Sequence, residues 1–304
     1  LVDILILILG LAILVFGAEI LIRGSVSFGK KLNISLFAIG VVIVAAGTSL
    51  PELASSINAI LNNHSDLALG AVVGSNIANL ILVMAATTII VPISNITNNQ
   101  INQAWINIAL GICLIIMSYF YFNYLFGIIS IIALTLIMYF QIKKGSIIVD
   151  DIDKNEYSIF ISLILIIFGV IFLIYGSDLF VNSAIILAKK LQVSEAVIGL
   201  SLIAFGTSLP ELVIGIMSAL KRKVDFALGN ILGSNIYNVL GVLGISSFFG
   251  QFSIPNILAT QDLFFMIFIT VLILFFMFFF KKLGKLYGVI GICLYFSYIY
   301  FIYG

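Results

Sequence analysis

The six-residue sequence Gly-Thr-Ser-Leu-Pro-Glu occurs twice in this chain, at 47–52 and 206–211, each time within a run of otherwise apolar residues. A charged side chain at the depth of a bilayer costs at least about 2.5 kcal/mol. A chain that places two carboxylates there is expected to use both. Buried structural salt bridges are the alternative, but neither apolar run contains a Lys, Arg or His. The repeated motif therefore indicates an ion-binding site inside a membrane.

Composition places the whole chain in a membrane. Hydrophobic residues make up 62% of the 304 and charged residues only 9%, whereas soluble domains are about 45–50% apolar and about 25% charged. The first apolar stretch has no preceding basic residue and no cleavage site, so we expect it to remain as a membrane helix. Spans of about 20 apolar residues predict an all-α integral membrane protein with ten transmembrane helices, at 4–27, 35–60, 67–91, 104–122, 125–142, 157–187, 195–219, 226–250, 262–280 and 284–302.

The two halves of the chain are repeats of one another. The longest polar segment, 143–156, separates a first repeat at 1–142 from a second at 157–304. Each repeat contains an odd number of predicted helices, so the second enters the membrane from the opposite face. We expect one transmembrane domain of two inverted five-helix repeats, an architecture typical of secondary transporters. Pairs related by an offset of 159 residues include Glu52 and Glu211, Gly17 and Gly176, Ser75 and Ser234, and Asn79 and Asn238.

The basic residues test this layout independently. In the ten-helix arrangement all but two of the 14 Lys and Arg residues fall at one membrane face, and only Lys189 and Lys190 fall at the other. Basic residues concentrate in cytoplasmic loops. The sequence therefore predicts a cytoplasmic linker at 143–156 and both termini outside. We expect a multi-pass protein in the plasma (inner) membrane of a prokaryote.

The proline of each hexapeptide predicts a broken helix at the middle of the membrane. Pro51 has no N–H for the carbonyl of Gly47, and its ring pushes that turn apart. Thr48 or Ser49 is expected to cap the half-helix that follows, and Glu52 lies in its first turn, where the helix dipole favours negative charge. The same holds around Pro210. Broken helices with converging carbonyls, hydroxyls and carboxylates are a means of holding cations in transporters.

Further oxygen atoms recur on the helix after each hexapeptide. Ser75 and Asn79 are four residues apart, as are their repeat counterparts, so each pair shares a helix face. Two carboxylates with amide, hydroxyl and carbonyl oxygens suit Ca²⁺ in number and charge. Mg²⁺ would need a tighter octahedral site, and transition metals would favour His or Cys. The one His, His64, is interpreted as a solvated loop residue.

Glycines recur at matched positions in both repeats. Gly70, Gly74, Gly229 and Gly233 precede the Asn residues by one and two turns, where we expect close helix approach. Glycines at 10, 17, 169 and 176 lie on the first and sixth helices. One hypothesis is that these two helices slide against a fixed core that carries Glu52 and Glu211. Helix packing alone explains the glycines nearly as well.

These motifs resemble a known family. The doubled hexapeptide, followed by Gly-Ser-Asn-Ile-x-Asn at 74–79 and 233–238, is similar to the two alpha-repeats of the sodium/calcium exchangers of the Ca²⁺/cation antiporter superfamily, especially its short prokaryotic members. The similarity covers essentially the whole chain. It implies a secondary antiporter, not an enzyme, that exchanges Na⁺ for Ca²⁺ by alternating access without a cofactor. The positions that match the family's ion ligands are Glu52, Glu211, Thr48, Thr207, Ser49, Ser208, Ser75, Ser234, Asn79, Asn238, Ala45 and Ala204.

One position departs from part of the family. Potassium-dependent exchangers and certain prokaryotic members carry Asp at the position of Asn238, whereas both repeats here have Asn. The site then keeps two carboxylates, which resembles the potassium-independent pattern. Two glutamates match the charge of Ca²⁺, and a third Na⁺ would leave the loaded site positive. The resemblance thus implies electrogenic exchange.

Other functions and residues stay open at this point. A proton-coupled Ca²⁺/cation exchanger could use the same glutamates, while an intramembrane protease is disfavoured by the duplicated carboxylate and the lack of a nearby His. Glu19 and Asp178, repeat counterparts, are interpreted as interfacial anchors or caps, with ion entry as the alternative. Cys113 and Cys293 are expected to be inert buried thiols. We expect the chain to be embedded in the lipid bilayer as a monomer, with no nucleic-acid or protein partner.

Overall fold

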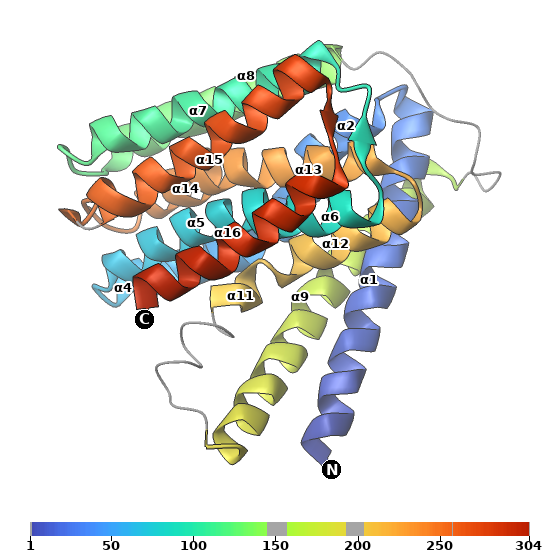
Figure 1. The fold of residues 1–304 in the computed structure, drawn as a ribbon, viewed down its shortest axis with the longest axis horizontal. Helices are drawn as coiled ribbons and strands as arrows, with labels where there is room; N and C mark the ends of the chain where they lie inside the picture. Colours follow the sequence, from blue (N-terminus) through green and yellow to red (C-terminus); the bar gives the residue numbers. More distant parts are fainter. Residues whose placement is uncertain (1, 145–156, 193–203, 257, 304) are drawn as a thin grey trace.

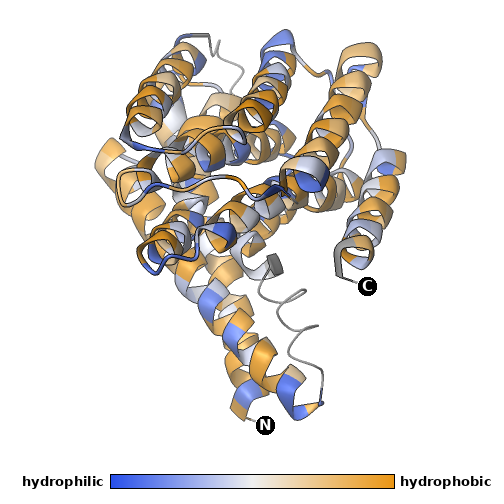
Figure 2. Ribbon diagram, turned by 90° about the vertical axis from the view of Figure 1, so that its left-hand side faces the viewer, coloured by the Kyte–Doolittle hydropathy of each residue, from blue (hydrophilic) through white to orange (hydrophobic). Residues whose placement is uncertain are grey.

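The need to satisfy backbone hydrogen bonds in lipid explains why this chain is almost entirely helical. A helix pairs its N–H and C=O groups internally, so it can cross hydrocarbon without water. The computed structural model describes residues 2–144, 157–192, 204–256 and 258–303. Hydrophobic residues cover the lengths of the helices, and hydrophilic residues gather at their ends (Figure 2).

The described residues form ten successive helical spans, and several of them contain a π-helical turn. Figure 1 shows how the labelled helices are arranged. The unbroken spans are α1 (Val2–Leu32), α7 (Asn98–Met117), α8 (Tyr124–Lys144), α9 (Ile159–Lys190) and α16 (Lys285–Tyr303). The second span combines α2 (Leu36–Ile39), η1 (Gly40–Val44), α3 (Ala45–Thr48) and α4 (Leu50–Leu61), and the third combines α5 (Ser65–Ala78), η2 (Asn79–Val83) and α6 (Met84–Ile90). The seventh contains α11 (Ala204–Thr207) and α12 (Leu209–Leu220), the eighth α13 (Val224–Ile236), η4 (Tyr237–Val242) and α14 (Leu243–Ser246), and the ninth η5 (Leu258–Asp262), α15 (Leu263–Phe275) and η6 (Phe276–Phe280).

The third and eighth spans form the centre of the molecule. Within their membrane-crossing windows, 72% and 94% of the residues are buried inside the protein, compared with 28% in α1 and in α9. These two spans are repeat counterparts, and both follow a hexapeptide. The two helices expected to carry oxygen ligands are therefore the most enclosed elements.

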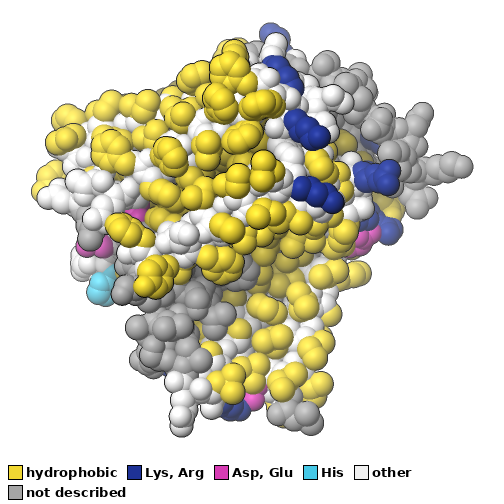
Figure 3. All heavy atoms as spheres, viewed as in Figure 1, with side chains coloured by type: hydrophobic (Ala, Val, Ile, Leu, Met, Phe, Trp, Pro, Cys, Tyr) yellow, Lys and Arg dark blue, Asp and Glu magenta, His cyan; other side chains and the backbone are white. Residues whose placement is uncertain are grey.

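Contacts at the two ends of the helices confirm the alternation of the ten spans. At one face, β1 (Ile93–Ser94) pairs antiparallel with β2 (Lys282–Leu283), and Gln100 donates a hydrogen bond to Asp225. At the opposite face, Phe122 forms a bridge with Phe252. Lys and Arg side chains gather along the edge of Figure 3 that contains β2 and the start of α16. If the predicted number of spans between two of these contacting segments were wrong by one, the two segments would lie at opposite faces and could not touch.

Two sequence predictions need correction. Helix α7 begins at Asn98, not near 104, because the side chain of Thr97 accepts from Gln100 N and that of Gln100 accepts from Thr97 N, a capping box that starts a helix among polar residues. Cys113 and Cys293 are free thiols, as expected, but they are exposed and not buried. Cys113 lies on α7 and Cys293 on α16. An apolar sequence around a cysteine in a membrane protein can face lipid as well as a protein core. Of the predicted linker 143–156, the first two residues belong to α8, and 145–156 lie outside the described residues.

Close helix crossing occurs at the glycines of the second repeat. A Cβ atom on Gly229 would lie 2.3 Å from the carbonyl oxygen of Phe37, and one on Gly233 would lie 2.8 Å from Val41 Cα. At Gly70 and Gly74 the expected crossing is not seen, since no described atom lies within 4 Å of the added Cβ. The counterparts of Phe37 and Val41 would be residues 196 and 200, which are outside the described residues.

Helices α1 and α9 lie side by side and project away from the other helices (Figure 1). Their glycines face each other: a Cβ on Gly10 would lie 3.1 Å from Gly176 O, and one on Gly17 would lie 2.9 Å from Leu173 N. These glycines therefore serve the α1–α9 contact. The helix-packing alternative thus accounts for these glycines, and the hypothesis that the two helices move against the core stays a prediction.

The Gly229 crossing generates a prediction. We expect Gly229→Ala to destabilise the detergent-solubilised protein by about 1–3 kcal/mol, because the methyl group would overpack against Phe37. The control is Gly241→Ala in the same span, where the nearest atom to the added Cβ is 3.4 Å away, an ordinary contact. Thermal unfolding followed by Trp105 fluorescence would measure both. Equal midpoints for the two variants would contradict the prediction.

Candidate functional site

Each hexapeptide forms a break between two short helices. The second span bends by 41° between Thr48 and Leu50, and Ser208 has nearly the same backbone angles as Ser49, with φ near −88° and −83°. Pro51 and Pro210 stand in the first turns of α4 and α12. Ser49 and Ser208 occupy the N-cap positions, but neither side chain makes a capping hydrogen bond, so the predicted capping is wrong. A capping side chain requires an extended backbone at its own residue, and the backbone of these two serines is not extended.

The carbonyl freed by proline is satisfied differently in the two repeats. In the second, Ser177 Oγ on α9 donates to Gly206 O at 3.0 Å. The repeat counterpart of Ser177 is Ala18, which has no donor. In the first repeat the backbone N–H of Ser49 reaches Gly47 O instead. One of the two projecting helices thus contacts one of the two breaks through a polar bond.

Glu52 and Glu211 are fully buried, each in the first turn after its break. Glu52 Oε2 and both carboxylate oxygens of Glu211 have no hydrogen-bond donor within the described part of the chain. Glu211 lies near Glu52, Thr48 and Ser234, and no Lys, Arg or His of the described residues pairs with either carboxylate. A buried charge without a partner is expensive. The pair therefore requires a cation or protons.

Hydroxyl groups connect the two repeats around these carboxylates. Ser75 Oγ donates to Glu52 Oε1 at 3.1 Å and accepts from Ser208 Oγ at 3.1 Å. Thr48 Oγ1 lies 3.2 Å from Ser234 Oγ and 3.4 Å from the carbonyl of Ala45. Each serine from a central span thus contacts the hexapeptide of the other repeat. The sequence prediction that these residues converge is correct.

Asn79 and Asn238 lie at the start of π-helical turns in the two central spans. Both are fully buried, and the Oδ1 atom of each lacks a donor among the described residues. A π-turn widens the helix locally and is common at functional sites. Of the remaining predicted residues, Ser49 is buried with its Oγ unpartnered, Thr207 lines a cavity, and Ala204 begins α11.

Three buried asparagines were missed by the sequence analysis. Asn76 and Asn235 hydrogen-bond to Asn238 and Asn79, respectively, and Asn230 Oδ1 accepts from Thr48 Oγ1 at 3.2 Å. Asn76 and Asn235 are related by the offset of 159 residues, so the repeat comparison contained their signal. Asn230 corresponds to Ala71, and the repeat comparison could not have found it.

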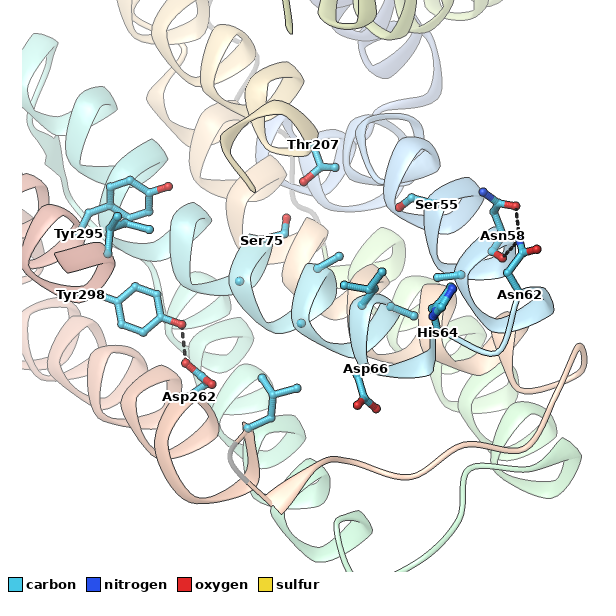
Figure 4. Close-up of a pocket in the computed structure, with 18 residues that line it drawn as sticks. Ser55, Asn58, Asn62, His64, Asp66, Ser75, Thr207, Asp262, Tyr295 and Tyr298 are labelled. Carbon is cyan, nitrogen blue, oxygen red and sulfur yellow. Dashed lines mark hydrogen bonds between the residues drawn. The ribbon is translucent and has the colours of Figure 1, made fainter. Parts of the chain in front are cut away.

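A cavity of about 660 Å³ runs from Ser75 and Thr207 towards the face opposite the basic residues. Figure 4 shows Ser75 and Thr207, from different repeats, near the middle of the view. Asn62 and His64, in the loop between α4 and α5, lie on one side of them, and Tyr295 lies on the other. Gly70 and Gly74 line its wall. Asp262 accepts a hydrogen bond from Tyr298 along the side. His64 is exposed, as expected for a solvated loop residue.

Glu19 and Asp178 lie away from this site. Glu19 on α1 pairs with Arg23 at 2.6 Å and with Lys221, at the end of α12, at 2.8 Å. Asp178 is exposed on α9. The pairing of Glu19 joins a projecting helix to the core, and its interpretation as an interfacial anchor stays a prediction.

Comparisons with known proteins agree with this geometry. A family model described as sodium/calcium exchanger protein matches residues 2–143 and 161–304. An uncharacterized membrane protein of Methanocaldococcus jannaschii, MJ0091, is 33% identical over 94% of this chain and 93% of its own length. The sodium/calcium exchanger MaX1 of Methanosarcina acetivorans is 28% identical over 84% of this chain and 85% of its own. A solved structure of the sodium-calcium exchanger NCX_Mj matches with a TM-score of 0.85 and 31% identity, over 98% of this chain and 97% of that one.

The unpartnered oxygens generate a prediction. We expect Ca²⁺ to stabilise the purified protein against thermal unfolding, by about 2.7 kcal/mol at 100 times its dissociation constant, and Mg²⁺ to do so less. Glu211→Gln should remove most of this gain, because the remaining charge no longer matches a divalent ion. Asp178→Asn removes an exposed carboxylate and serves as the control. Equal Ca²⁺ stabilisation of Glu211→Gln and the control would exclude Glu211 from the cation site.

Proposed function

Because the chain belongs to the sodium/calcium exchanger family, we propose that it is a secondary antiporter that exchanges Na⁺ for Ca²⁺ across the membrane at the site between the two hexapeptides. The observation that carries the proposal is a pair of fully buried glutamates, one from each inverted repeat, with no basic partner in the described structure. Ca²⁺ would neutralise both. Hydroxyl and amide oxygens around them supply the hard ligands that Ca²⁺ and Na⁺ prefer.

The proposed ion ligands come from both repeats in equal number. Glu52 and Glu211 carry the charge, and the serine, threonine and asparagine oxygens complete the coordination. Unpartnered buried oxygens on Ser49, Asn79 and Asn238 support this assignment, since such atoms are rare in folded proteins. The proposed set is Glu52, Glu211, Thr48, Thr207, Ser49, Ser208, Ser75, Ser234, Asn79 and Asn238, with the backbone carbonyls of Ala45 and Ala204.

We propose that exchange is electrogenic and independent of K⁺. Asn at both 79 and 238 keeps the site at two carboxylates. Two negative charges balance one Ca²⁺, whereas a load of more than two Na⁺ leaves the site positive. Net charge then moves in each cycle, and the membrane potential acts on it at about 2.3 kcal/mol per charge per 100 mV.

We propose that the two five-helix repeats, 1–142 and 157–304, form one transmembrane domain with 143–156 as a cytoplasmic linker, in the plasma membrane of a prokaryote. The basic face of the molecule supports a cytoplasmic position for the β1–β2 ribbon, which places both termini outside. The 660 Å³ cavity then leads from the outer solution to Ser75 and Thr207. The chain is proposed to act as a monomer.

Transport assays in proteoliposomes test this function. We expect Ca²⁺ uptake to require an outward Na⁺ gradient and to proceed with K⁺ replaced by choline on both sides. Glu52→Gln and Glu211→Gln should each abolish uptake while the protein stays folded, and Asp178→Asn should transport normally.

Three outcomes would change the proposal. Uptake driven by a proton gradient without Na⁺ would establish the proton-coupled alternative. A strict K⁺ requirement would overturn the interpretation of Asn238. Normal transport by either glutamine variant would remove that glutamate from the site.

Alternating access requires that part of the molecule move relative to the site, and the α1–α9 pair is the proposed moving part. The two helices pack mainly on each other and are largely exposed to lipid. Their polar contacts with the core include the Glu19–Lys221 ion pair and the bond from Ser177 to Gly206. A single, partly exposed ion pair contributes only roughly 0–1 kcal/mol, so it does not by itself fix the helix pair to the core.

Cross-linking tests the motion. In a background lacking Cys113 and Cys293, cysteines at Glu19 and Lys221 joined by a short bifunctional reagent should stop exchange, because they tie α1 to α12. The control is a pair at Gln100 and Asp225, which hydrogen-bond between α7 and α13 within the core. Cross-linking the control pair should leave exchange intact. Unimpaired exchange after complete cross-linking of the first pair would refute the moving role of α1.

A further inference from the structure

We propose that Asn76 and Asn235 are positioning residues that hold the side-chain oxygens of Asn79 and Asn238 towards the transported cation. The inference rests on the proposed function, because it takes Asn79 and Asn238 as ligands. It concerns two residues outside that ligand set and an arrangement that crosses between the repeats.

The first step is the attachment of Asn76 and Asn235 to the backbone. Asn76 Nδ2 donates to the carbonyl oxygen of Asn235 at 3.4 Å, and Asn235 Nδ2 donates to that of Asn76 at 3.2 Å. Both side chains are 2% exposed. The amide nitrogen of each is therefore used by the backbone of the other repeat. Their side-chain oxygens must point in the opposite direction, as acceptors.

The second step transfers this orientation to the ligands. Asn238 Nδ2 donates to Asn76 Oδ1 at 3.0 Å and to Ser75 Oγ at 3.3 Å. Asn79 Nδ2 donates to Asn235 Oδ1 at 3.1 Å. Each ligand amide thus has its nitrogen held on the side away from its unpartnered oxygen. A flipped amide would present N–H donors to a cation, which repels them.

The arrangement crosses between the repeats. Asn76, in the first repeat, orients Asn238 in the second, and Asn235 orients Asn79 in the first. Loss of one positioning residue should therefore damage the ligand of the opposite repeat. A partner that only filled space would show no such crossed dependence.

The test measures Ca²⁺ binding to the purified protein in detergent by titration calorimetry. Asn76→Leu keeps the side-chain volume but removes the acceptor, so we expect binding roughly tenfold weaker, the lower range for loss of an outer-shell partner. A carboxylate has two equivalent oxygens and needs no orientation. Asn238→Asp should therefore restore Ca²⁺ binding in the Asn76→Leu background. The affinity of the double variant should exceed the affinity predicted by adding the effects of the two single substitutions.

The repeat supplies the matched control. Asn235→Leu should be rescued by Asn79→Asp and not by Asn238→Asp, while Asn76→Leu should show the reverse. Equal rescue by either Asp would mean that added charge alone restores binding, and it would overturn the inference. Wild-type binding by both Leu variants would also overturn it. Where a Leu variant does not fold, the corresponding Ala variant is measured with the same Asp substitutions and the same two outcomes.

The failure of this inference can be told apart from the failure of the proposed function. If Glu52→Gln and Glu211→Gln lose Ca²⁺ binding while Asn76→Leu and Asn235→Leu keep it, only the positioning role is wrong. If the glutamine variants bind Ca²⁺ normally, the proposed site itself is wrong.

Discussion

Two buried carboxylates without a basic partner are the constraint on which the rest of this structure depends. Glu52 and Glu211 are fully enclosed, and three of their four oxygens lack a donor within the described residues. Such a pair is tolerated only if the surroundings can deliver and hold a compensating charge. The broken helices, the hydroxyls of the central spans and the cavity of about 660 Å³ are the elements that meet this requirement.

Inverted symmetry brings the proposed ligands together, and departures from it distinguish the two halves. The offset of 159 residues relates the hexapeptides, the serines and all four asparagines of the crossed network. It fails at Ser177, whose counterpart is Ala18, and at Asn230, whose counterpart is Ala71. Both exceptions contact a hexapeptide. The two breaks therefore have unequal surroundings.

The molecule divides into an enclosed core and a helix pair, α1 and α9, that packs mainly on itself. Backbone crossings such as Gly229 over Phe37 leave no room for adjustment within the core. The contacts of α1 and α9 are chiefly with each other. The polar ties described between the pair and the core are Glu19–Lys221 and Ser177–Gly206. This difference in packing is what the proposed motion of α1 and α9 relative to the site rests on.

The sequence by itself determined the number and alternation of the spans, the broken helices and most of the site. Hydropathy, proline and an internal repeat at a constant offset act through local rules, because lipid enforces helices and Pro51 or Pro210 interrupts them. Only the tertiary structure decided which side of an apolar helix is buried and which oxygens remain free. Cys113 and Cys293 lie in apolar stretches yet face outward, and Asn76 is a partner of Asn238 only because the repeats cross. The absence of a cap at Ser49 likewise follows from backbone angles that the residue type does not set. Contacts between segments 159 residues apart depend on how the helices pack, and no local pattern contains that information.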